Sequence, residues 1–236
     1  MSRTLGKKEN ILLNRPQTVA FDVIETLFSL EPLRARFQEA QLPPDKLELW
    51  FAKILRDGFA LAAADVFQPF QQVAAGTLAV FLADEGQKPD NDKIQSILQG
   101  FSELKAHPDV APAFEKLRAA DVRILTLTNG SKENTQKLLR EAQLESFVEQ
   151  IIAIDEVQQW KPRREVYRHA ARQAGVEPSQ MALVAAHAWD VQGARRAGLV
   201  TGWVQRQEKL FHPALEKPDV SGGTLLEVCE QLLALP

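Results

Sequence analysis

The sequence predicts an α/β fold: a Rossmann-like, doubly wound parallel sheet with an all-helical segment inserted after the first strand. Two observations lead to this prediction. Short β-branched or aliphatic runs alternate with amphipathic helical patterns, and one long segment contains helical patterns only. The 236 residues, 45% of them hydrophobic and 25% charged, suffice for one large core or a core plus a smaller domain.

Five apolar runs are predicted to be buried parallel strands, because each is short and rich in aliphatic residues. These runs are residues 18–21, 122–127, 150–154, 181–186 and 200–204. Helical patterns long enough to connect parallel strands lie between them. They cover residues 110–120, 132–142, 164–174 and 191–197, with a last helix near 224–235 and a turn at Gly222-Gly223.

Residues 31–106 break this alternation and contain only helical patterns, at 32–40, 44–63, 69–85 and 90–101. Prolines fall between these patterns, where they cannot continue a helix. The predicted organisation is therefore a core domain and a helical cap, preceded by an extension. The core covers 17–30 and 107–236, the cap 31–106, and the N-terminal extension 1–16.

Composition excludes several classes of partner. A net charge of −3 gives no basic surface for nucleic acid, and no run approaches the ~20 apolar residues of a membrane span. The single cysteine, Cys229, cannot form an internal disulfide, which fits a reducing compartment. We therefore expect a cytoplasmic protein that binds neither nucleic acid nor membranes.

Polar side chains follow the predicted strands, starting with an aspartate directly after the first one. Because the carboxyl ends of parallel strands meet at one edge of a sheet, residues far apart in sequence become neighbours there. The candidates are Asp22, Thr128 with Asn129, Lys161, and Asp190 with His187.

Each candidate also has a purely structural interpretation. Thr128 and Asn129 would cap the helix that starts near residue 132, and Asp190 would cap a helix from residue 191. Lys161 would be a solvated residue before a proline. Taken together, the four groups favour a catalytic site over four unrelated structural roles.

These motifs resemble the haloacid dehalogenase superfamily, and most closely its type II 2-haloacid dehalogenases. The likeness spans roughly residues 19–206, and the helical insertion corresponds to the family's cap. Leu127-Thr128-Asn129-Gly130-Ser131 resembles the family's Ser-Asn-Gly-Ser, Trp160-Lys161-Pro162 with Tyr167 resembles its Lys-Pro and later tyrosine, and Ala188-Trp189-Asp190 resembles its Ala-Trp-Asp.

The resemblance implies a hydrolase that cleaves the carbon–halogen bond of short 2-halocarboxylates through an ester on Asp22. Lys161 would keep this carboxylate ionised, and Asp190 would orient Lys161 or the attacking water. Thr26 is expected to hydrogen-bond the carboxylates. The expected substrate-binding residues are Thr128, Asn129, Tyr167, His187, Trp189 and Phe51.

Ile24 bears on the type of reaction. Phosphatases of this superfamily usually carry an aspartate two residues after the nucleophile, which protonates the leaving oxygen. Isoleucine cannot donate a proton, whereas chloride and bromide leave without one. Ile24 therefore favours carbon–halogen cleavage, and we expect neither a cofactor nor a required metal.

Other positions depart from the family pattern. Glu25 stands where the family commonly has glycine, and an outward-pointing Glu25 would avoid repelling an anionic substrate. Phe51 stands where the family has a substrate-binding arginine. His187 stands where the family often has asparagine. It is expected to be a hydrogen-bond donor near the water, a partner for Asp190, or a strand-end histidine whose hydrogen bonds are satisfied. The cap cations that could replace the arginine are Lys53, Arg56, Arg34 and Arg36.

Two alternative functions follow from these departures. The first is a catalytically impaired member that binds a small carboxylate or a protein partner. The second is a Mg-dependent phosphatase in which Glu25 replaces the missing acid. The resemblance also implies a possible homodimer.

Overall fold

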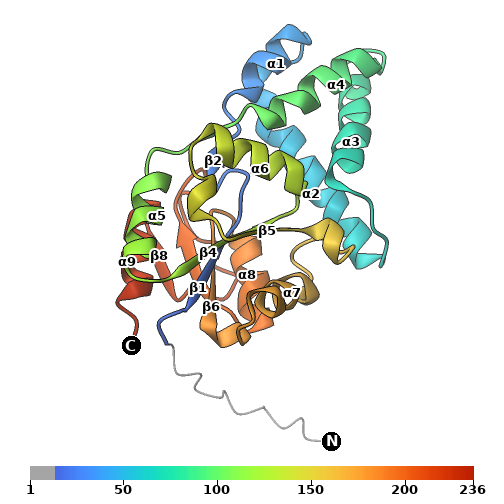
Figure 1. The fold of residues 1–236 in the computed structure, drawn as a ribbon. Helices are drawn as coiled ribbons and strands as arrows, with labels where there is room; N and C mark the ends of the chain where they lie inside the picture. Colours follow the sequence, from blue (N-terminus) through green and yellow to red (C-terminus); the bar gives the residue numbers. More distant parts are fainter. Residues whose placement is uncertain (1–13) are drawn as a thin grey trace, which may run out of the picture.

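The computed structural model describes residues 14–236, so most of the N-terminal extension expected at residues 1–16 lies outside the described residues. The centre of the molecule is a six-stranded parallel sheet in the order β5-β4-β1-β6-β7-β8 (Figure 1). The strands are β1 (Thr18–Phe21), β4 (Arg123–Thr128), β5 (Gln150–Ala153), β6 (Met181–Ala185), β7 (Val200–Val204) and β8 (Val220–Gly222). All five predicted strands are present.

The strand order reverses at β1, which pairs with β4 on one side and β6 on the other. Because right-handed crossovers in opposite directions place their helices on opposite faces, the sheet is doubly wound. The connecting helices are α5 (Val110–Ala119), α6 (Lys132–Glu141), α7 (Arg164–Ala174) and α8 (Ala188–Ala197), and α9 (Leu225–Leu233) follows the last strand. Asp22 follows β1 directly and therefore lies at the reversal point.

The inserted segment forms the helical layer at the top of Figure 1. It consists of α1 (Leu33–Glu39), α2 (Leu47–Ala63), α3 (Phe70–Asp84) and α4 (Asn91–Gln99). It has its own aromatic core, in which Phe37 lies 5.4 Å from Trp50 and 6.2 Å from Phe81 between ring centroids. The apolar faces of these helices thus pack against each other.

Three short strands were not predicted. The antiparallel pair β2 (Phe28–Ser29) and β3 (Lys105–Ala106) joins the two ends of the inserted segment, so residues 31–106 are not entirely helical. Gly222 belongs to β8 and not to a turn. Helix α8 begins at Ala188, three residues before the predicted start, because His187 and not Asp190 is its N-cap.

The single cysteine, Cys229, is fully buried in α9 as a free thiol. No helix within residues 14–236 is long and apolar enough to cross a membrane.

Candidate active site

Asp22 lies at the carboxyl end of β1 and is 6% exposed. Its backbone N–H donates to the carbonyl of Val184 at 3.0 Å, which extends the β1–β6 ladder and fixes the residue at the sheet edge. Its Oδ2 accepts a hydrogen bond from Thr26 Oγ1 at 2.7 Å, and Thr26 Oγ1 in turn accepts from the backbone N–H of Ala186 at 2.9 Å. The carboxylate is thereby held in one orientation.

Lys161 is fully buried, and its ammonium group donates three hydrogen bonds. The acceptors are Asp22 Oδ1 at 2.8 Å, Asp190 Oδ2 at 2.7 Å and the carbonyl oxygen of Leu127 at 2.9 Å. All three protons of the ammonium group are therefore used. The interpretation of Lys161 as a solvated residue is wrong.

These contacts set the ionisation of the pair. Burial acts to raise the pKa of Asp22, but Lys161 and His187 outweigh it and hold the pKa well below its usual range. Burial acts to lower the pKa of Lys161, but Asp190 and Asp22 outweigh it, so that pKa is raised. Asp22 is thus a carboxylate and Lys161 an ammonium ion at neutral pH.

Asp190 lies in the first turn of α8 and is fully buried. Its second oxygen accepts a hydrogen bond from the hydroxyl of Tyr167 at 2.6 Å. Tyr167 is itself fully buried, so it lies behind Asp190 instead of facing a substrate as expected. Gly193 makes this contact possible, because a Cβ there would overlap the Tyr167 hydroxyl.

Thr128 ends β4, and its Oγ1 accepts from the backbone N–H of Gly130 at 2.9 Å. Asn129 Oδ1 accepts from the backbone N–H of Lys161 at 3.1 Å. The N-cap of α6 is Ser131, whose Oγ accepts from the backbone N–H of Asn134. The capping role considered for Thr128 and Asn129 is therefore wrong, and both side chains border the cavity at Asp22.

Glu25 points inward, not outward. Glu25 is 6% exposed, and its Oε2 lies 2.8 Å from Nε2 of His187. The other ring nitrogen of His187, Nδ1, lies 3.6 Å from Asp22 Oδ2. Burial acts to lower the pKa of His187, but Asp22 and Glu25 outweigh it and raise that pKa to about 10. His187 is therefore a cation paired with Glu25, not a partner of Asp190.

A small cavity of about 20 Å³ borders these groups. A single water molecule needs about 10–15 Å³ of such volume, so the cavity has room for one water but for no larger molecule. Its polar lining comes from the sheet edge and its apolar lining largely from the cap. The lining residues are Asp22, Ile24, Phe51, Leu55, Phe70, Thr128, Asn129, His187 and Trp189.

The cap cations expected to replace the missing arginine lie elsewhere. Each pairs with an acidic side chain, and none borders the cavity. Lys53 pairs with Asp84, Arg56 with Asp57, Arg36 with Glu103, and Arg34 with Glu31 and Glu48. Phe51 itself faces the cavity and is 5% exposed.

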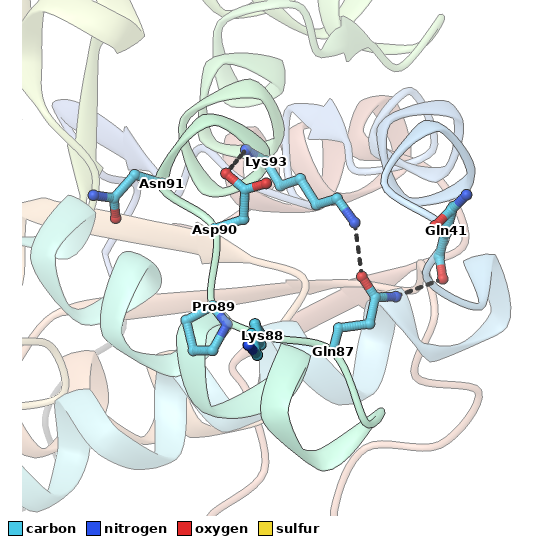
Figure 2. A pocket seen from close by; sticks show the side chains of 7 residues that line it. All are labelled: Gln41, Gln87, Lys88, Pro89, Asp90, Asn91 and Lys93. Atoms are coloured by element: carbon cyan, nitrogen blue, oxygen red, sulfur yellow. Dashed lines mark hydrogen bonds between the residues drawn. The ribbon is translucent and has the colours of Figure 1, made fainter.

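The described residues also form larger and more open hollows. One, of about 810 Å³, lies on the outer part of the cap around Gln87 and Asp90, away from the sheet edge (Figure 2). Another, of about 580 Å³, lies between α3, α4 and the start of α6. This hollow shares Ile24 and Phe70 with the small cavity, so these two side chains separate the cavity from the hollow.

Comparisons with known proteins show which family the chain resembles. A family model described as haloacid dehalogenase-like hydrolase matches residues 16–198. The chain is 30% identical to (S)-2-haloacid dehalogenase 1 of Pseudomonas sp. (strain CBS-3), covering 70% of this chain and 74% of the relative. It is 26% identical to (S)-2-haloacid dehalogenase of Pseudomonas sp. (strain YL), covering 90% and 92%.

The fold is also found among solved structures. L-2-haloacid dehalogenase from Xanthobacter autotrophicus superposes with a TM-score of 0.84 at 22% identity, covering 94% of this chain and 100% of that one. At this level of identity the match shows the shared fold, including the helical insertion.

Proposed function

Because this chain belongs to the haloacid dehalogenase-like hydrolases, we propose that it hydrolyses short 2-halocarboxylates to 2-hydroxy acids and halide. The observation that carries this proposal is the buried contact of 2.8 Å between Asp22 and Lys161, beneath the cap and at the reversal point of the sheet. A carboxylate held ionised in a small cavity beneath an apolar cap wall is a nucleophile to which little bulk water has access.

In the first step, an Asp22 carboxylate oxygen attacks C2 of the substrate, and the halide leaves with the bonding electron pair. Lys161 and Thr26 hold the carboxylate in its orientation, and Lys161 balances the charge that is redistributed as the ester forms. Water then hydrolyses the ester and regenerates Asp22. Asp190 and Tyr167 act as positioning residues, because they hold the Lys161 ammonium group from behind.

The position of Glu25 argues against the phosphatase alternative. That function needs an acid that can protonate the leaving oxygen, and Ile24 offers none. Glu25 does not border the cavity, and its carboxylate is bound to His187 at 2.8 Å. Halide departure needs no such acid, so the residues present favour the dehalogenase reaction.

Substrate access requires movement of the cap. The small cavity of about 20 Å³ cannot hold a halocarboxylate beside Asp22. The hollow bordered by α3 and α4 approaches the cavity at Phe70 and Ile24. We propose that substrate enters there when α3 moves away from the sheet edge.

We also propose that the enzyme requires no metal, acts in the cytoplasm and forms a homodimer. Asp22 and Asp190 share the Lys161 ammonium group, which already supplies the positive charge that a metal would bring. Activity is expected to survive EDTA, and sedimentation velocity measures the assembly state.

The central experiment measures halide release from both enantiomers of 2-chloropropionate by wild type and Asp22→Asn. We expect release by wild type and none above background by Asp22→Asn, with Asp45→Asn, an exposed cap position, as the matched control. If wild type releases halide from neither enantiomer, the proposal is overturned. Magnesium-dependent hydrolysis of an aryl phosphate, lost in Asp22→Asn, would favour the phosphatase instead.

A further inference from the structure

Two residues that depart from the family pattern contact each other beside the nucleophile. Glu25 stands where the family commonly has glycine, and His187 where it often has asparagine. Glu25 has a φ of 65°, a left-handed conformation that glycine adopts easily and other residues rarely do. The chain keeps a glutamate there, and its carboxylate binds His187.

The two ring nitrogens of His187 face different carboxylates, Glu25 on one side and Asp22 on the other. Nε2 bonds Glu25, whereas the buried Nδ1 has no hydrogen-bond partner within residues 14–236. Nδ1 lies 3.6 Å from Asp22 Oδ2, and His187 borders the small cavity together with Asp22 and Asn129. The three groups thus lie in the spatial order Glu25 carboxylate, His187 imidazole and Asp22 carboxyl group. This is the arrangement of a base oriented by an acid next to the group that is attacked.

We propose that His187 is the general base that activates the water which hydrolyses the Asp22 ester, with Glu25 as its positioning residue. This inference rests on the proposed dehalogenase function, because it concerns the second half of that reaction. The small cavity that His187 and Asp22 border has room for one water molecule, which is the co-reactant of this step.

Asp190 is less suited to this role. It is fully buried and does not border the cavity. Its Oδ1 accepts from Tyr167 and its Oδ2 from Lys161, so both oxygens are already engaged. Among the described side chains that line the cavity, His187 is the one with a ring nitrogen to take up a proton.

The charge of Asp22 controls the state of His187. In the free enzyme, the carboxylates of Asp22 and Glu25 raise the pKa of His187 against the effect of burial, so Nδ1 carries a proton. Other titratable groups near the pair are Lys161, bonded to Asp22, His107, whose Nε2 lies 3.2 Å from the Glu25 carbonyl oxygen, and Glu208, whose carboxylate accepts from the Ala188 backbone N–H. The neighbouring Phe51 and Trp189 are uncharged. Esterification removes the Asp22 charge, which lowers the pKa of His187 and frees Nδ1 to act as a base.

The atoms and protons balance over the cycle. As the ester forms, halide leaves with its electron pair and Nδ1 releases its proton to solvent. Water then adds through its oxygen to the carboxyl carbon of Asp22 while one of its protons passes to Nδ1. The bond between that carbon and the ester oxygen breaks, and Nδ1 returns the proton to the hydroxy acid. The new Asp22 carboxyl group ionises and reprotonates His187.

The experiment follows one turnover of (S)-2-chloropropionate by rapid quench, with chloride assay and mass measurement of the peptide containing Asp22. For His187→Asn, we expect a chloride burst near one equivalent, accumulation of the ester, and steady-state turnover lower by about 10²–10⁴-fold. His212→Asn, at an exposed position, is the matched control and should behave as wild type. Turnover by His187→Asn at the wild-type rate without ester accumulation would overturn the proposal.

Measurements on wild type keep the test independent of the variant's folding. Proton release should accompany the chloride burst, and ester hydrolysis should slow as pH falls while the burst rate stays constant. Glu25→Gln should shift the pH profile of ester hydrolysis to lower pH, which a merely structural role would not do. A pH-independent ester hydrolysis would overturn the proposal, whereas absence of both chloride and ester in wild type would instead overturn the dehalogenase function itself.

Discussion

The two walls of the small cavity at Asp22 differ in chemistry. The wall formed by the carboxyl edge of the sheet carries the ionisable groups, in particular Asp22 and His187, with Lys161 directly behind them. The wall formed by the cap consists of Phe51, Leu55 and Phe70. The core therefore supplies charge and proton transfer, and the cap supplies shape and exclusion of water.

The same residue type has a different role in each region. Lys161 is fully buried between Asp22 and Asp190, whereas the cap residue Lys53 pairs with Asp84, whose side chain is 54% exposed. Removing one member of a buried ion pair leaves an uncompensated charge, but exposed pairs contribute little. Matched substitutions in the two regions therefore measure this difference directly.

The largest effect is expected for Lys161→Met. Loss of the ammonium group leaves Asp22 and Asp190 as close like charges, which should destabilise the fold by about 3–5 kcal/mol. Dehalogenation should fall by at least about 10²–10³-fold, because the nucleophile loses its counter-ion. Urea denaturation and chloride assays compare this variant with Lys53→Met, which should lose less than about 1 kcal/mol. Equal losses in both variants would contradict the division of roles.

The next effect is a dependence of stability on pH that originates at the core wall. The pKa of His187 is raised from about 6.5 to about 10 in the folded protein. The contribution of His187 to the free energy of unfolding is therefore complete below pH 6.5. It is lost as pH rises toward 10, a change of about 2–4 kcal/mol. Urea denaturation at pH 6.5, 8 and 10 measures it. The loss should be much smaller in His187→Asn, and equal slopes in both proteins would contradict the pairing.

A smaller effect is expected for Tyr167→Phe. The substitution removes the hydroxyl that bonds Asp190, a hydrogen bond to a charged group worth about 1.5–3 kcal/mol. Turnover should fall by about tenfold because Asp190 then holds Lys161 less firmly. In the cap, Thr77→Val removes a hydroxyl that bonds Asp57 and the Val73 carbonyl, and it should leave turnover unchanged. A loss of turnover in Thr77→Val would show that the cap also affects the chemistry.

The sequence predicted the core wall better than the cap wall. Asp22 and Thr128 could be placed because each follows a strand, and the carboxyl ends of parallel strands share one edge. The positions of the cap cations could not be predicted, since helical spacing does not reveal which acidic partner a side chain finds. Lys53, for example, bonds Asp84 on another helix.

Glu25 and Tyr167 show why details of the site were missed. Glu25 points inward because the chain turns through a left-handed conformation there, which the residue type does not predict. Tyr167 lies behind Asp190 because Gly193 of the neighbouring helix leaves room for its hydroxyl. That glycine, three residues after Asp190, was the available signal for close packing between α7 and α8.

The smallest expected effect comes from giving the cap wall the charge it lacks. Phe51→Arg places a cation opposite Asp22, where it can pair with the carboxylate of a bound 2-halocarboxylate. We expect KM for 2-chloropropionate to fall by about tenfold, equivalent to about 1.4 kcal/mol, with little change in kcat. Phe51→Met, which keeps an apolar side chain, is the control. A KM no lower in Phe51→Arg than in Phe51→Met would mean that the core wall alone binds the substrate carboxylate.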